Sequence, residues 1–145
     1  MDNYTNEELT EALREVSSTI NKCEKMQGKF VEGTSQYSLL RNRIKAMYIS
    51  KLLIVNELSK IEQTVANRAG DVVQKWEFDR KNVMVHYTKE ELTEALRPIV
   101  SVISKCEKAQ GKFEEGTTHH TRFKNIIKAM YISKSLIEDQ LSTME

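Results

Sequence analysis

The chain contains one segment of 56 residues twice, and this duplication constrains the fold more than any other feature of the sequence. Residues 4–59 align with residues 87–142 at a constant offset of 83, and 36 of the 56 aligned positions are identical. Because two such similar copies are expected to adopt the same local structure, we divide the chain into copy one (1–68), a spacer (69–86) and copy two (87–145).

Each copy begins with the pattern of a helix N-terminus. Thr5 and Glu8 have the spacing of a capping box, and Tyr4 and Leu9 have the spacing of a hydrophobic staple. Copy two repeats the whole device at Tyr87, Thr88, Glu91 and Leu92. Apolar residues then recur three and four positions apart, which predicts one narrow apolar stripe on a helix: Leu9, Leu13, Val16, Ile20, Cys23 and Phe30.

A break and a second helix follow in each copy. Glu32-Gly33-Thr34 interrupts the pattern, because Gly33 can adopt a left-handed conformation and Thr34 or Ser35 can cap the next helix. The second helix should run to about Arg68, with Gly70 as its stop. Its apolar positions are Leu40, Ile44, Met47, Tyr48, Ile54, Leu58, Ile61 and Val65. A short loop makes two such helices antiparallel neighbours.

The predicted fold is all-α, with two duplicated antiparallel helical hairpins packed as a bundle. One hairpin of this size buries little surface, so the two apolar stripes must pack together within the chain or between chains of an oligomer. In the spacer, Phe78, Val83 and Val85 favour a short β-hairpin, and a continued helix followed by an extended linker is the alternative. Pro98 replaces Glu15 of copy one and should kink its helix or shift the start.

Composition and motifs exclude several functions. The net charge of +1 gives no general basic field for nucleic acid or an anionic membrane, and no apolar run approaches the roughly 18 residues of a membrane span. We therefore expect a cytoplasmic protein without membrane contact. No Ser-His-Asp order, phosphate loop, zinc spacing or kinase signature occurs, so we expect neither an enzyme nor a cofactor or metal.

The cysteines and histidines have structural interpretations. Cys23 and Cys106 are equivalent positions on the apolar stripes, which favours small buried side chains in a reducing compartment; a redox or inter-chain role is the alternative. His86, His119 and His120 are not shared by both copies, and adjacent histidines on a helix point in different directions. Solvated positions are therefore expected for them.

A basic and aromatic pattern on the second helix is the candidate binding site. The segment from Ile44 to Lys51 is identical in both copies, including its polar positions. Cations and a tyrosine at three-to-four spacing share one helix side, where they can hold an anion and stack on a base. The alternative is a basic surface beside a tyrosine at the edge of the core. The candidate residues are Arg41, Lys45, Tyr48 and Lys51 in copy one and Lys124, Lys128, Tyr131 and Lys134 in copy two.

The unit resembles a family of short helical-hairpin proteins of Gram-positive bacteria and their phages. The resemblance rests on YTxEEL, on SKCEKAQGKF at Ser104–Phe113, on EGT at Glu115–Thr117 and on KNIIKAMYIS at Lys124–Ser133. It covers both copies and implies no activity. In size and architecture the chain is also similar to the phage sponges of the anti-CBASS and anti-Thoeris families, from which no residue role is carried over.

These observations give three functional hypotheses. The first is a phage or mobile-element counter-defence protein that forms a homo-oligomer and sequesters a small anionic, nucleotide-type signal. The second is a protein-interaction module that inhibits a host defence protein, with its interface where the copies differ, as at Leu39 against Arg122 and Arg43 against Ile126. The third is a DNA-binding regulator, which the near-zero net charge disfavours.

Overall fold

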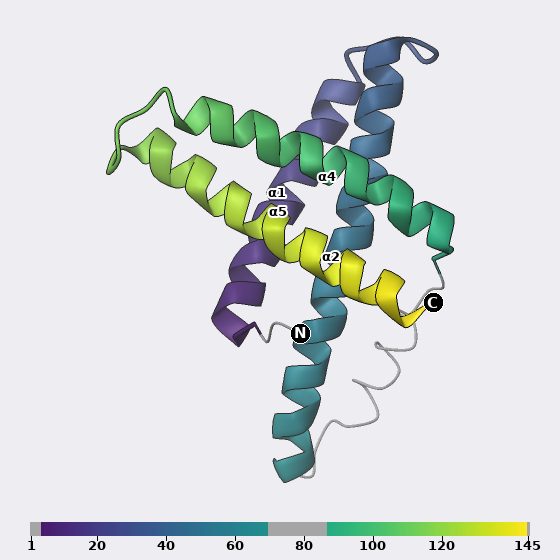
Figure 1. Cartoon of the computed structure of the whole chain (residues 1–145), viewed down its shortest axis with the longest axis vertical. Helices are drawn as coiled ribbons and strands as arrows, with labels where there is room; N and C mark the ends of the chain where they lie inside the picture. Colours follow the sequence, from purple (N-terminus) through teal and green to yellow (C-terminus); the bar gives the residue numbers. More distant parts are fainter. Residues whose placement is uncertain (1–3, 70–86, 145) are drawn as a thin grey trace.

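The computed structural model describes residues 4–69 and 87–144, which form four helices that pack as a bundle. Helices α1 (Asn6–Gln27) and α2 (Ser35–Ala69) form one antiparallel hairpin, and α4 (Lys89–Gln110) and α5 (Thr118–Thr143) form the other. The second hairpin lies across the first, and the two hairpin loops project away from the crossing (Figure 1). The predicted all-α bundle is therefore confirmed. The β-hairpin predicted for the spacer lies outside the described residues.

The two copies begin their helices in the same way. The side chain of Thr5 accepts a hydrogen bond from the backbone N–H of Glu8, whose carboxylate accepts one from the backbone N–H of Thr5. Thr88 and Glu91 form the same pair of bonds. These reciprocal bonds satisfy backbone donors that a helix N-terminus otherwise leaves free. Both predicted capping boxes are confirmed.

The first helix ends earlier than its apolar pattern predicts. Helix α1 stops at Gln27, and Phe30 lies in the loop. The prediction that Phe30 belongs to the helical stripe was therefore wrong. The backbone N–H groups of Lys29 and Phe30 bond to carbonyls three residues back, which tightens the chain into turns after Gly28. Gly33 has a φ of 95°, the left-handed conformation that the sequence suggested.

Pro98 lies inside α4 without moving its start. The helix begins at Lys89, the position equivalent to Asn6, and continues past Pro98 to Gln110. Of the two effects expected of this proline, a kink or a shifted start, the shifted start is not observed. Because proline has no N–H, the carbonyl of Glu94 lacks its usual helical donor, but the packing of the helix on its neighbours keeps it continuous.

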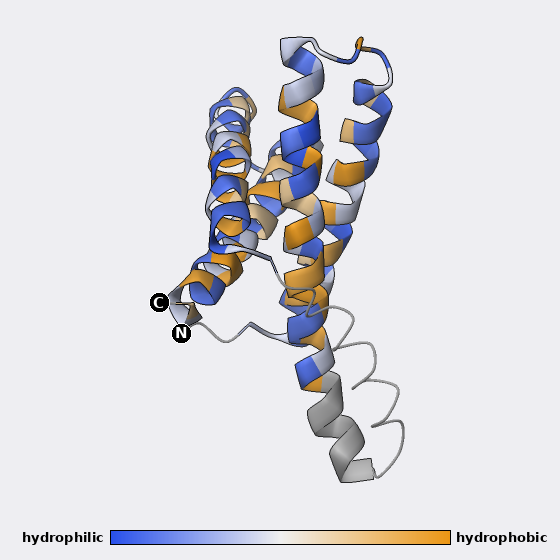
Figure 2. Ribbon diagram, turned by 90° about the vertical axis from the view of Figure 1, so that its right-hand side faces the viewer, coloured by the Kyte–Doolittle hydropathy of each residue, from blue (hydrophilic) through white to orange (hydrophobic). Residues whose placement is uncertain are grey.

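A single hydrophobic core joins the two copies. The apolar stripes of α1 and α4 are buried against the second helices, and hydrophobic positions gather on the sides of the helices that face one another (Figure 2). Helix α1 packs on α2 and α5, whereas α4 packs on α5 and α2. The fully or almost fully buried side chains come from both copies: Leu9, Val16, Met47, Ile49, Ile54, Leu92, Ile99, Met130 and Ile137. The stripes are thus covered within one chain.

Candidate functional site

The eight candidate residues lie on the second helix of each copy. On α2, Arg41, Lys45 and Tyr48 are exposed and Lys51 is half-buried. The same pattern holds on α5, where Lys124, Lys128 and Tyr131 are exposed and Lys134 is half-buried. The duplication therefore places two equivalent basic and aromatic surfaces on the bundle.

The shared lysines pair with carboxylates of the other copy. Lys45 Nζ lies 3.4 Å from Glu91 Oε2, and Lys128 Nζ lies 3.5 Å from Glu8 Oε2. Both glutamates are the capping residues described above. The pKa of each is lowered, first by the hydrogen bond from the capping threonine's backbone N–H and further by the neighbouring lysine. Each lysine thus lies beside a carboxylate that stays ionised.

The shared tyrosines turn toward a different neighbour. The hydroxyl of Tyr48 donates to Glu24 Oε2 at 3.1 Å, and that of Tyr131 donates to Glu107 Oε2 at 3.2 Å. The hydrogen bond to Glu24 raises the pKa of Tyr48, and the charge of Glu107 raises that of Tyr131. The lysine therefore contacts the other hairpin and the tyrosine its own, and carboxylates border the basic surface on both sides.

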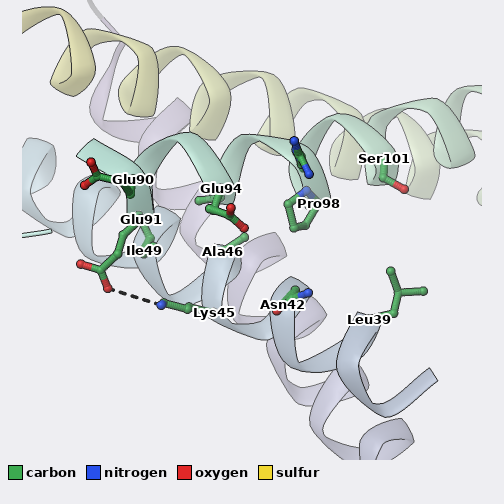
Figure 3. Close-up of a pocket in the computed structure, with 12 residues that line it drawn as sticks. Leu39, Asn42, Lys45, Ala46, Ile49, Glu90, Glu91, Glu94, Pro98 and Ser101 are labelled. Carbon is green, nitrogen blue, oxygen red and sulfur yellow. Dashed lines mark ion pairs between the residues drawn. The ribbon is translucent and has the colours of Figure 1, made fainter. Parts of the chain in front are cut away.

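A groove of about 500 Å³ lies beside Lys45, between α2 and α4 (Figure 3). We call it the α2/α4 groove. The buried side chains of Ala46, Ile49 and Ala95 contribute to its lining. Toward one end lie Leu39, which is 51% exposed, and Pro98. The remaining lining residues are polar or charged: Asn42, Lys45, Glu90, Glu91, Glu94, Arg97 and Ser101.

The other side of the bundle carries the equivalent groove, between α1 and α5. This α1/α5 groove has a volume of about 160 Å³. Its lining residues are Glu7, Glu8, Glu11, Ala12, Glu15, Asn125, Lys128, Ala129 and Ile132, and each is the counterpart of a residue lining the α2/α4 groove. Duplication has therefore produced two versions of one site within a single chain.

Two lining positions of the larger groove differ between the versions. Leu39 corresponds to Arg122, and Pro98 corresponds to Glu15. The other ten residues that line the α2/α4 groove are identical to their equivalents in the other copy. Both differences replace an apolar side chain with a charged one. The α2/α4 groove thus has Leu39 and Pro98 toward one end and carries three carboxylates and two cations, whereas the α1/α5 groove carries four carboxylates and one lysine.

The groove residues contributed by α4 were not identifiable as a site from the sequence. Glu90, Glu94 and Ser101 belong to a helix whose pattern reads as an ordinary solvated surface, and Pro98 was interpreted only through its effect on the helix. The available signal was the divergence between the copies. It singled out Leu39 and Pro98 separately, and only the packing of α2 on α4 brings them to one end of one groove.

The cysteines occupy the stripe without forming a bridge. Cys23 is buried and Cys106 is half-buried, and burial raises the pKa of both thiols. The charge of Arg43 opposes this effect at both cysteines. No Cα atom of α1 lies within 8 Å of one in α4, which is too far for a disulfide between them. Burial of Cys23 was predicted correctly, whereas the same prediction for Cys106 was wrong because its side chain is only half-buried.

The hairpin ends carry the main apolar side chains left in water. Met26, Phe30 and Val31 are exposed at the end of the first hairpin. At the end of the second, the Phe113 ring stacks on His119 at 4.8 Å and on Phe123 at 6.0 Å between centroids. His119 is exposed and His120 half-buried, while His86 lies outside the described residues. Among the side chains that the structure describes, no three metal-ligating groups come together.

Comparison with protein-family models, with curated proteins and with solved structures gave no match. Among the helices that the structure describes, none has both the length and the apolar character needed to cross a membrane. Functional inference therefore rests on the geometry of the bundle itself.

Proposed function

We propose that this protein is a non-enzymatic binding module that recognises another protein through the α2/α4 groove. One observation carries the proposal: the two lining positions at which the copies differ, Leu39 and Pro98, are both apolar in the larger groove, and the equivalent positions of the other copy, Arg122 and Glu15, are both charged. A patch needed only for folding would not require this difference, because the buried alanines and isoleucine of the groove are the same in both copies.

The geometry favours a protein partner over a small anionic nucleotide. A phosphate that approached Lys45 would meet three carboxylates in the same groove, against the two cations Lys45 and Arg97, and one that approached Lys128 would meet four carboxylates. Such like charges oppose anion binding. The hydroxyl of Tyr48 already donates a hydrogen bond to Glu24. The lysine–glutamate pairs are more readily explained as contacts between the hairpins than as a phosphate site.

The resemblance to phage hairpin proteins adds the proposal that the partner is a defence protein of a bacterial host. In that role the module acts in the host cytoplasm by covering a surface that the defence protein needs. Association of several copies is a further proposal. Because the helix stripes are buried within one chain, its support now comes from the exposed apolar side chains at the hairpin ends, such as Phe30 and Val31.

Site-specific photo-crosslinking in the native host cells tests this function. A benzophenone amino acid replaces Leu39 in one variant and its counterpart Arg122 in another. Both side chains are exposed at equivalent positions, so the second variant is a matched control. We expect a discrete protein adduct from position 39 that is absent from position 122 and that disappears when Pro98→Glu is added.

Two results would contradict the proposal. If the two positions give the same adducts, the crosslinks reflect nonspecific contacts and the α2/α4 groove has no special role in binding. If position 39 gives no protein adduct, the groove does not contact a protein in the cell. In either case the nucleotide hypothesis regains priority.

A further inference from the structure

We infer that the occupant of the α2/α4 groove is a short amphipathic helix that carries lysine or arginine next to an apolar anchor. This inference rests on the proposed function and specifies the chemistry of the partner. It follows from the length of the groove, the position of its apolar end and the charge at its other end.

The lining of the groove covers about three turns of each helix. Its lining extends from Leu39 to Ile49 on α2 and from Glu90 to Ser101 on α4. At 1.5 Å per residue, these spans correspond to roughly 15 Å. A partner helix of about ten residues covers that length, and a groove between two helices is a common way to bind the apolar face of a third.

The apolar end of the groove offers a place for an anchor. Leu39 and Pro98 lie on opposite sides of it, on α2 and α4 respectively (Figure 3). Leu39 keeps 51% of its surface in water although its side chain is entirely apolar. Covering this side chain with a leucine or methionine of the partner would remove apolar surface of both molecules from water, which is favourable.

The other end of the groove selects positive charge. Glu90, Glu91 and Glu94 line it, and among the described residues Lys45 forms its ion pair with Glu91. Glu90 and Glu94 form no ion pair with any residue that the structure describes. Glu94 lies one helical turn from Pro98, and Glu90 lies two turns away. A partner helix with its anchor beside Pro98 can therefore place cations one and two turns further along.

Comparison with the α1/α5 groove separates the contribution of charge from that of the apolar anchor. The α1/α5 groove is more acidic but has Glu15 in place of Pro98. If charge alone selected the occupant, a basic helix would prefer the α1/α5 groove. If the apolar anchor is also required, the helix binds only between α2 and α4.

Fluorescence anisotropy with synthetic peptides tests the inference on the full-length protein. The probe is a labelled helical peptide of about fourteen residues, with leucines on one face and lysines one and two turns beyond them. Its control carries glutamate at the lysine positions. We expect the lysine peptide to bind at least about tenfold more tightly than the glutamate peptide, a difference of about 1.4 kcal/mol.

Variants of the protein locate the peptide. Pro98→Glu and Leu39→Arg should each weaken binding about tenfold or more. Both variants should fold, because copy one already carries glutamate at the position equivalent to 98 and copy two carries arginine at the position equivalent to 39. The double variant Glu90→Gln, Glu94→Gln should weaken binding roughly two- to tenfold, since exposed ion pairs contribute little individually. The matched pair Glu7→Gln, Glu11→Gln in the α1/α5 groove should leave binding unchanged.

Three results would overturn the inference: equal binding of both peptides, no binding of either, or an equal loss from the Glu7 and Glu11 variant. These outcomes are distinguishable from failure of the proposed function. A protein adduct at position 39 together with a failed peptide experiment would retain the docking site and reject the basic helix as its occupant.

Discussion

Replacement of Ile99 by alanine should destabilise both hairpins together. Ile99 lies on the stripe of α4 and is fully buried in the core that both copies share. Truncation of a buried isoleucine costs about 2–5 kcal/mol because it removes apolar contacts and leaves a cavity. This is a large part of the roughly 5–15 kcal/mol by which a typical domain is stable.

The assay is thermal and urea denaturation followed by circular dichroism. At roughly 2–4 °C per kcal/mol, the Ile99→Ala variant should melt about 4–20 °C below the wild type. The neighbouring residue Val100 is 45% exposed and provides the control. Val100→Ala should change the free energy of unfolding by less than about 0.5 kcal/mol, because it removes few contacts and alanine favours helix.

The result that would refute this reasoning is independent unfolding of the hairpins. If the variant shows two transitions, with copy one melting at the wild-type temperature, the hairpins do not share a core. An equal effect of Ile99→Ala and Val100→Ala would also refute it, since the difference in burial would then have no energetic consequence.

Three further predictions follow from the electrostatics and burial of individual side chains. The pKa of Glu8 and of Glu91 is lowered in the folded chain, so their contribution to stability is complete above the ordinary value of 4.5 and is lost as the pH falls below it. The melting temperature should therefore drop as the pH falls below about 4.5, and a Glu8→Ala, Glu91→Ala variant should show a smaller drop; an unchanged drop would contradict this assignment. A thiol reagent should label half-buried Cys106 before buried Cys23 in the native protein, as measured on the two single Cys→Ser variants, and faster labelling of Cys23 would be inconsistent with its burial. Lys45→Ala removes an exposed ion pair and should cost less than about 1 kcal/mol of unfolding free energy in urea titrations, so a larger loss would show that the pair has a greater role in joining the hairpins than its exposure implies.

Local features of the fold were predictable from the sequence because they depend on neighbours in the chain. The capping boxes at Thr5 and Thr88 involve residues three positions apart, and the extension of the second helix to Ala69 follows its own apolar period. The end of α1 was misplaced because Phe30 continues the spacing of the stripe, although the chain has already turned after Gly28.

The candidate site was less predictable because it depends on how the hairpins cross. Lys45 and Glu91 are far apart in sequence. Neither the basic pattern that contains Lys45 nor the capping box that contains Glu91 indicates that the two side chains form an ion pair. The sequence identified a basic surface on α2 but not the carboxylates that α4 places beside it. The sequence shows that the copies differ at Leu39 and Pro98. Only the packing of α2 on α4 shows that these two residues line the same groove.

Calorimetric titration of the protein captured at position 39 tests the central claim most directly. The purified partner is titrated into wild type and Pro98→Glu, and a panel of cyclic oligonucleotides and ADP-ribose derivatives is titrated into wild type and Lys45→Ala. The account predicts that the partner binds wild type, that Pro98→Glu binds it about tenfold more weakly or worse, and that no nucleotide binds at micromolar concentration. Micromolar binding of a nucleotide that is lost in Lys45→Ala, with no effect of Pro98→Glu on the partner, would contradict it.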